Sequence, residues 1–159
     1  MVLRDGFERL KSEEIRWGVL SVNFSSEWIR GIAGVGGEVQ VIANSVDEEG
    51  VIRGPNVIQE EVMATCDGKL KGLRELVKSL GGNGMEKVIY VGDSGTDLEC
   101  LVEDGIVGVV MSTDGESSLM KTLARIGVDV RYVKDYDIGF AGLYWVRDFV
   151  ELLNSPLFK

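Results

Sequence analysis

Histidine is absent from this chain of 159 residues. Its absence excludes Ser-His-Asp and Cys-His catalysis, zinc sites built on imidazole, and a pH switch that depends on histidine protonation. Cysteine is scarce as well, because only Cys66 and Cys100 occur and they lie far apart in the sequence. A structural disulfide is therefore not expected, and a reducing compartment is the simpler interpretation.

Long apolar runs and basic clusters are also missing. No apolar run approaches the ~20 residues of a membrane-spanning helix, and residues 1–14 carry too many charges to form a signal peptide. The net charge is −9, with 17 basic and 26 acidic side chains, whereas nucleic-acid binding depends on clustered lysine and arginine. We therefore expect a cytoplasmic protein whose partners are neither membranes nor nucleic acids.

The residues that are present are typical of one α/β domain spanning residues 1–159 with a core of its own. Apolar runs that indicate strands alternate with segments of helical spacing, and short glycine-containing turns join them. This alternation predicts a doubly wound, Rossmann-like parallel sheet. Strands are expected over residues 17–25, 38–43, 88–91, 106–111 and 128–133, and a hairpin-like excursion is expected over residues 45–55. Helices are expected over residues 2–14, from 25 to about 34, from about 69 to 81–82, from 96 to about 103, over 116–126 and from about 143.

The stretch KVIYVGDSGTD at residues 87–97 carries the strongest functional signal. A buried strand ends at a glycine, Asp93 follows at once, and Asp97 comes after a tight Ser-Gly turn. The carboxyl ends of parallel strands are where α/β proteins hold their ligands. Two carboxylates there, with no lysine or arginine between them, suit a hard cation such as Mg²⁺. We predict a metal or phosphate site at this turn, and a solvated turn with incidental acids is the alternative.

Two further polar residues occupy comparable positions. Ser21 lies toward the tip of the first strand, and Lys69 lies near a helix start, where the backbone dipole disfavours a cation. A lysine there hints at an anionic ligand, with an ordinary surface lysine as the alternative. Because strand tips gather at one edge of a parallel sheet, these residues and Asp93 can converge. A hydroxyl and a lysine could hold phosphate oxygens, and a carboxylate could hold the Mg²⁺ that shares them.

In this chain order the segments LSVNFS, DGKLKGLREL and GDSGTDLECL resemble the second, third and fourth motifs of the haloacid dehalogenase-like (HAD) superfamily of phosphatases. The resemblance covers nearly the whole chain. Within the superfamily, the chain is similar to the eukaryotic, fungal-type branch related to phosphoserine phosphatase. It implies Mg²⁺-dependent hydrolysis of a small phosphorylated metabolite. It also implies phosphate binding by Ser21 and by Lys69, with Lys71 as the alternative lysine. In the fourth motif, Asp93 would ligate the metal and Asp97 would support its coordination sphere.

The first motif of that family has no counterpart here. Family members begin with a strand ending in DxD, whose first aspartate is the nucleophile, and nothing upstream of Ser21 fits. Asp5 stands alone before a helix, while Asp67 follows the second motif and has Thr65 at the nucleophile's position. We therefore expect a chain that is N-terminally truncated relative to the family and lacks its cap. Loss of the nucleophile removes the covalent step and weakens the Mg²⁺ site.

The missing strand would lie between the strands at residues 17–25 and 88–91. Neighbouring strands lie ~4.8 Å apart, so a vacant position leaves both backbones unpaired, at roughly 1–3 kcal/mol per buried group. Either these strands pair directly, or a partner chain or self-association completes the sheet, or the sequence is a fragment of a longer product. The prediction is a HAD-like phosphohydrolase domain that is inactive alone, and the alternative is a non-catalytic regulatory or interaction module on that fold.

Overall fold

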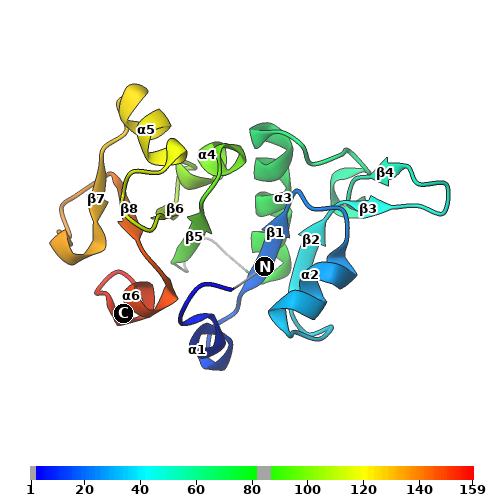
Figure 1. The fold of residues 1–159 in the computed structure, drawn as a ribbon, viewed down its shortest axis with the longest axis horizontal. Coiled ribbons are helices and arrows are strands. Elements are labelled where there is room, and N and C mark those ends of the chain that lie inside the picture. Colours follow the sequence, from blue (N-terminus) through cyan, green and yellow to red (C-terminus); the bar gives the residue numbers. More distant parts are fainter. Residues whose placement is uncertain (1–2, 82–86) are drawn as a thin grey trace. The chain divides into compact units, whose positions relative to one another are not determined.

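The structure is a computed structural model that describes residues 3–81 and 87–159 (Figure 1). The chain divides into two compact units, which are described separately below. Ile15–Glu86 form the first unit, and Val2–Glu14 together with Lys87–Lys159 form the second. The fold is mixed α/β with parallel strand pairing and flanking helices, as the sequence predicts. The single domain expected from the chain length stays a prediction.

A parallel pair of strands forms the centre of the first unit. β1 (Gly18–Ser21) pairs with β2 (Gln40–Ala43), and α2 (Ser26–Ala33) connects them. The helix begins where the sequence predicts, because Ser25 caps it and its side-chain oxygen accepts the Trp28 N–H. The unit therefore begins with a β-α-β connection, the form that parallel pairing requires.

A longer helix, α3 (Cys66–Ser79), packs against both strands of this pair. It begins three residues earlier than the sequence predicts, because Thr65 acts as N-cap and accepts the Gly68 N–H. Lys69 therefore lies at the end of the first helical turn instead of at the helix start. The core under this helix is made of Ile42, Ile58, Met63 and Leu76.

The predicted excursion of the first unit is a small antiparallel hairpin. β3 (Ser45–Val46) pairs with β4 (Ile52–Arg53), and a short 3₁₀ turn, η1 (Asn56–Ile58), follows. The Asp47 side chain holds the hairpin loop by accepting the N–H groups of Glu49 and Val51. The acidic loop is therefore ordered by its own carboxylate, as in an Asx turn.

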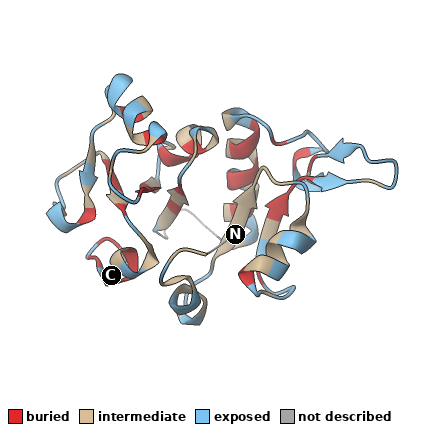
Figure 2. Ribbon diagram, in the orientation of Figure 1, coloured by how far each residue is buried: buried red, intermediate tan, exposed pale blue. Residues whose placement is uncertain are grey.

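Four parallel strands form the sheet of the second unit. Their order is β5-β6-β8-β7, with β5 at Val88–Gly92, β6 at Ile106–Met111, β7 at Val130–Tyr132 and β8 at Leu143–Val146. β6 and β8 are central, and Figure 2 shows most of their length as buried. The residues that form the core here are Val109, Met111, Val133, Tyr144, Val146, Leu152 and Leu157.

Four helices accompany this sheet: α1 (Phe7–Ser12), α4 (Leu98–Leu101), α5 (Ser118–Arg125) and α6 (Phe149–Asn154). A 3₁₀ turn, η2 (Gly95–Asp97), precedes α4. A second one, η3 (Val133–Asp135), follows β7. Within the described ranges, none of the helices has the length and apolar character that crossing a bilayer requires.

The closing segment and the N-terminal helix differ most from the sequence prediction. The run LYWV, expected to open the closing helix, is instead β8, so residues 128–133 are not the last strand. A four-residue apolar run has no decisive period, and here pairing with both β6 and β7 makes it a strand. The helix expected over residues 2–14 is reduced to α1, because Gly6 turns the backbone at φ 83° just before it. Val2 lies outside the described residues.

The described strands do not form one continuous sheet. β1 has β2 as its hydrogen-bonded neighbour, and β5 has β6. Among the strands that the structure describes, β1 and β5 therefore each leave one edge of their own sheet without a partner strand. The three arrangements expected from the sequence for these two strands stay predictions.

We expect Gly6→Ala to destabilise the second unit. A Cβ at Gly6 would lie 2.5 Å from the backbone nitrogen of Val150, in addition to the roughly 1–2 kcal/mol that alanine loses in the left-handed region. Gly127 has φ 82° with nothing within 4 Å of its added Cβ, so Gly127→Ala measures the backbone cost alone. Urea denaturation should show the larger loss for Gly6→Ala, and equal losses would mean that the contact with α6 does not matter.

Candidate functional site

The acidic turn after β5 is held in place by the buried carboxylate of Asp97, which is 3% exposed. Its Oδ1 accepts the hydroxyl proton of Tyr90 at 2.5 Å. Its Oδ2 accepts the backbone N–H groups of Asp93 and Ser94 at 3.1 and 2.9 Å, and the Ser94 hydroxyl at 2.8 Å. Both oxygens are thus engaged by the protein, and Asp97 fixes the turn.

Tyr90 and Gly92 complete this arrangement, and the sequence analysis did not single out either of them for it. Burial raises the pKa of Tyr90, and the negative charge of Asp97 raises it further, so the phenol stays protonated and donates. A Cβ on Gly92 would lie 2.6 Å from the Asp97 Cβ, so the carboxylate fits only against glycine. The pattern Tyr-Val-Gly-Asp could have revealed the pair, because Tyr90 is a polar-tipped residue inside an otherwise apolar strand.

Asp93 has a different environment from Asp97. It directly follows the last residue of β5 and is exposed. Within residues 3–81 and 87–159, no hydrogen bond or ion pair engages its carboxylate, and no group of three or more acidic or cysteine side chains is placed to hold a metal ion. The turn therefore offers a cation one carboxylate, and any bound Mg²⁺ would draw its other ligands from water and phosphate oxygens.

In the first unit, the start of α3 lies beside the carboxyl end of β1. A Cβ on Gly72 would lie 2.8 Å from Leu20 Cδ1, and one on Gly18 would lie 2.8 Å from Leu76 Cδ1. Helix and strand thus run in opposite directions along each other, since later helix residues meet earlier strand residues. Residues one turn before Gly72 are therefore level with the end of β1, where Ser21 is the last strand residue.

Lys69 belongs to that first turn and is buried, with 6% of its surface exposed. Lys71, the alternative lysine, is half-exposed and pairs with Asp67 at 2.9 Å and with Glu61 at 3.0 Å. Its hydrogen bond to Asp67, and next that to Glu61, raise the pKa of Lys71. The local geometry thus favours Lys69 over Lys71 as the lysine near Ser21.

Asn44 is a further polar residue at this edge that the sequence analysis missed. It is buried, directly follows β2, and donates to the carbonyls of Val22 and Met63 at 2.9 and 3.0 Å. It also accepts the Met63 N–H at 2.8 Å. Asn44 thereby ties the loop after β1 to the segment that leads into α3. Its position after a strand, the same signal that identified Ser21, could have revealed it.

The three residues considered as substitutes for the missing nucleophile have other roles. Thr65 caps α3 with its hydroxyl oxygen, and Asp67 pairs with Lys71. Asp5 lies in the turn before α1, where its carbonyl accepts the Phe149 N–H. None of the three belongs to a strand, so among the described residues these positions do not reproduce a strand ending in DxD.

The four predicted site residues fall into both units. Ser21 and Lys69 belong to the first unit, at one end of β1, and Asp93 and Asp97 belong to the second, after β5. Their convergence around one ligand stays a prediction. A cavity of about 540 Å³ in the second unit is lined by residues that include the first residues of β6 and β8. It therefore lies at the opposite end of the sheet from Asp93.

We expect Tyr90→Phe to destabilise the second unit by roughly 1–3 kcal/mol, because it leaves a buried oxygen of Asp97 without its donor. Tyr132→Phe is the matched control, since the Tyr132 hydroxyl also donates to a carboxylate, that of Glu151, which keeps other donors and cations. Denaturant unfolding of both variants measures the difference, and an equal cost would mean that Asp97 does not depend on Tyr90.

The stability of the wild type relative to Tyr90→Phe should also depend on pH in the alkaline range. The folded state keeps the Tyr90 proton because its pKa is raised, whereas the unfolded chain releases it near pH 10. The contribution of Tyr90 to the free energy of unfolding is therefore fully present below pH 10 and decreases as the pH rises above 10. The stability difference between wild type and Tyr90→Phe should shrink by about 1.4 kcal/mol by pH 11, and a constant difference would contradict the assignment.

Comparisons with known proteins identify no relative from which a role could be transferred. No protein-family model matches the chain, and no curated protein and no solved structure matches it either. Function is therefore inferred from the residues themselves, above all from the exposed Asp93 and the buried Lys69.

Proposed function

We propose that the chain is a HAD-like phosphohydrolase domain that binds Mg²⁺ and a small phosphorylated metabolite but lacks the nucleophile and is inactive, or nearly so, alone. The observation that carries the proposal is the turn after β5. There both carboxylate oxygens of Asp97 accept hydrogen bonds from the protein, while Asp93 remains exposed at the end of a parallel strand.

The donor set at this turn fits Mg²⁺ in one particular mode. Magnesium commonly takes one or two carboxylates and completes its octahedral shell with waters and substrate phosphate oxygens. Asp93 supplies one carboxylate, and the Asp97 hydrogen bonds keep it at the strand end without a competing cation. Bound there, Mg²⁺ would neutralise phosphate charge. A site of this kind should be weak for the metal alone and stronger when phosphate is present.

The phosphate half of the proposal rests on the first unit. Lys69 is buried in the turn of α3 that lies level with the end of β1, and a lysine ammonium at such a position can donate to phosphate oxygens. Ser21 adds a hydroxyl at that strand end, where its oxygen accepts the Asn23 N–H at 3.2 Å, and its proton has no acceptor within the described residues. An ammonium and a hydroxyl are the donors that a phosphate group needs.

Hydrolysis itself requires a group that these residues do not supply. In HAD phosphatases an aspartate carries the phosphoryl group, and here Thr65 and Asp67 are engaged in capping and in an ion pair. The same observation favours the second candidate function, a non-catalytic module that senses or presents a phosphorylated ligand. The two candidates differ in turnover, not in binding.

Binding of Mg²⁺ is tested by thermal unfolding. At a concentration about ten times its dissociation constant, Mg²⁺ should stabilise the wild type by about 1.4 kcal/mol, which corresponds to a rise of a few degrees in Tm. Asp93→Asn should abolish the rise. Asp104→Asn, which removes the same charge from an exposed residue at the opposite end of the sheet, should retain it. A response retained in Asp93→Asn would contradict the assigned ligand.

Turnover of a generic aryl phosphate in the presence of Mg²⁺ separates an enzyme from a binding module. We expect a rate at background, since removal of one member of a catalytic set costs on the order of a million-fold in turnover. Turnover that disappears in Asp93→Ala would contradict this expectation and show that a nucleophile is present. The readout is released phosphate. If any turnover is found, its loss in a Lys69→Met variant would show that it depends on the first unit.

A further inference from the structure

The N-terminal strap, residues 3–14 of the second unit, is tied to α6. The Phe149 N–H donates to the carbonyl of Asp5 at 2.9 Å, and the Phe7 and Phe149 rings lie 5.6 Å apart. Arg9 donates to a side-chain oxygen at the end of α6 at 2.8 Å. The strap therefore has a fixed path along the second unit, and the residues that it carries have defined positions.

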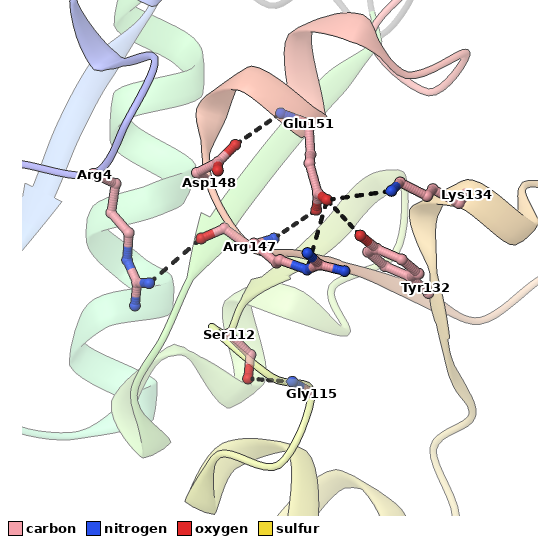
Figure 3. A network of polar contacts seen from close by, with 8 residues as sticks. All are labelled: Arg4, Ser112, Gly115, Tyr132, Lys134, Arg147, Asp148 and Glu151. Carbon is pink, nitrogen blue, oxygen red and sulfur yellow. Dashed lines mark hydrogen bonds and ion pairs between the residues drawn. The ribbon is translucent and has the colours of Figure 1, made fainter.

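Arg4 is held by the strap at the carboxyl edge of the four-stranded sheet. Its Nη1 donates to Thr113 Oγ1 at 3.1 Å and to the carbonyl of Arg147 at 3.4 Å, and Figure 3 shows the second of these bonds. Thr113 follows β6 by two residues, and Arg147 directly follows β8. The guanidinium thus bridges the ends of two neighbouring strands.

One edge of this guanidinium has no protein partner in the part of the chain that the structure describes. Both of its hydrogen bonds come from Nη1, so Nε and Nη2 are left without acceptors. These two N–H groups form the planar fork with which arginine binds two oxygens of a phosphate or carboxylate. The two hydrogen bonds from Nη1 position the guanidinium before a ligand arrives.

Two other cations near this edge, Lys134 and Arg147, share the carboxylate of Glu151 as their partner. Its carboxylate accepts the Tyr132 hydroxyl and the Arg147 N–H, and it lies within 3.9 Å of the Lys134 and Arg147 side chains (Figure 3). Burial alone would raise the pKa of Glu151, but these donors and cations hold it below its ordinary value. Glu151 is therefore charged and pairs with Lys134 and Arg147, whereas Arg4 has no paired carboxylate among the described residues.

Arg4 and Asp93 share one edge of the sheet. β5 and β6 are neighbours with Gly92 opposite Val110, so Asp93 and Thr113 both lie beyond the carboxyl ends of adjacent strands. We infer that Arg4 is an oxyanion-binding residue, which holds a phosphate group through Nε and Nη2. The ligand class rests on the proposed function, while the role of Arg4 follows from its own contacts.

Titration with inorganic phosphate in the presence of MgCl₂, followed by ³¹P NMR, tests the role of Arg4. Arg4→Gln should weaken phosphate binding ten- to a hundredfold, the value of a hydrogen bond to a charged group. Arg4→Lys should be intermediate, because it keeps the charge but loses the fork. Arg125→Gln removes the same charge from an exposed residue at the end of α5 in the same unit and should leave the affinity unchanged.

The outcomes separate this inference from the proposed function. If the wild type binds phosphate and Arg4→Gln matches Arg125→Gln, the inference is wrong and the proposed function stands. If the wild type binds no phosphate with Mg²⁺ present, both are wrong. The rise in Tm with Mg²⁺ alone, measured on Arg4→Gln, reports whether the edge remains folded. With that rise retained, the loss of phosphate binding is attributable to the guanidinium.

Discussion

The carboxylate of Asp97 is the group on which the acidic turn of the second unit depends. A buried charge is strongly destabilising unless hydrogen bonds replace its hydration. Here four donors do so, from Tyr90, the backbone of the turn and the Ser94 hydroxyl. Because these bonds reach back to the N–H of Asp93, they also set the conformation of that residue. Two aspartates four positions apart thus differ in environment: Asp97 is buried and anchors the turn, whereas Asp93 is exposed.

Local signals were sufficient where a segment's neighbours in sequence determine its structure. Ser25 begins α2 as predicted, and the run Ile106–Met111 is a strand throughout its predicted length. They failed where distant contacts decide the outcome. β8 is a strand because β6 and β7 flank it, and α1 is short because Gly6 approaches the backbone of α6, more than 140 residues away in sequence.

For the candidate site too, the sequence indicated the positions that depend on local signals and missed those that depend on distant contacts. The rule that ligands gather at strand ends identified Ser21 and Asp93 from the sequence. It could not distinguish Asp97 from Asp93, because both read as acids in one turn, and the phenol that engages Asp97 lies inside the strand. Arg4 was beyond sequence reasoning, since its position depends on how the strap packs against α6.

Under the proposed function, a metal ion on Asp93 and the guanidinium of Arg4 would act together on the charge of a phosphate at the carboxyl edge of the second unit. A phosphate monoester carries nearly two negative charges at neutral pH, and Asp93 alone would repel it. A divalent cation on Asp93 leaves one net positive charge, and the unpaired guanidinium of Arg4 contributes a second. Lys134 and Arg147 both pair with the single carboxylate of Glu151, which offsets one of their two positive charges. In this proposal, a cation on Asp93 would remove the repulsion between that carboxylate and a phosphate dianion, and Arg4 would add its own attraction.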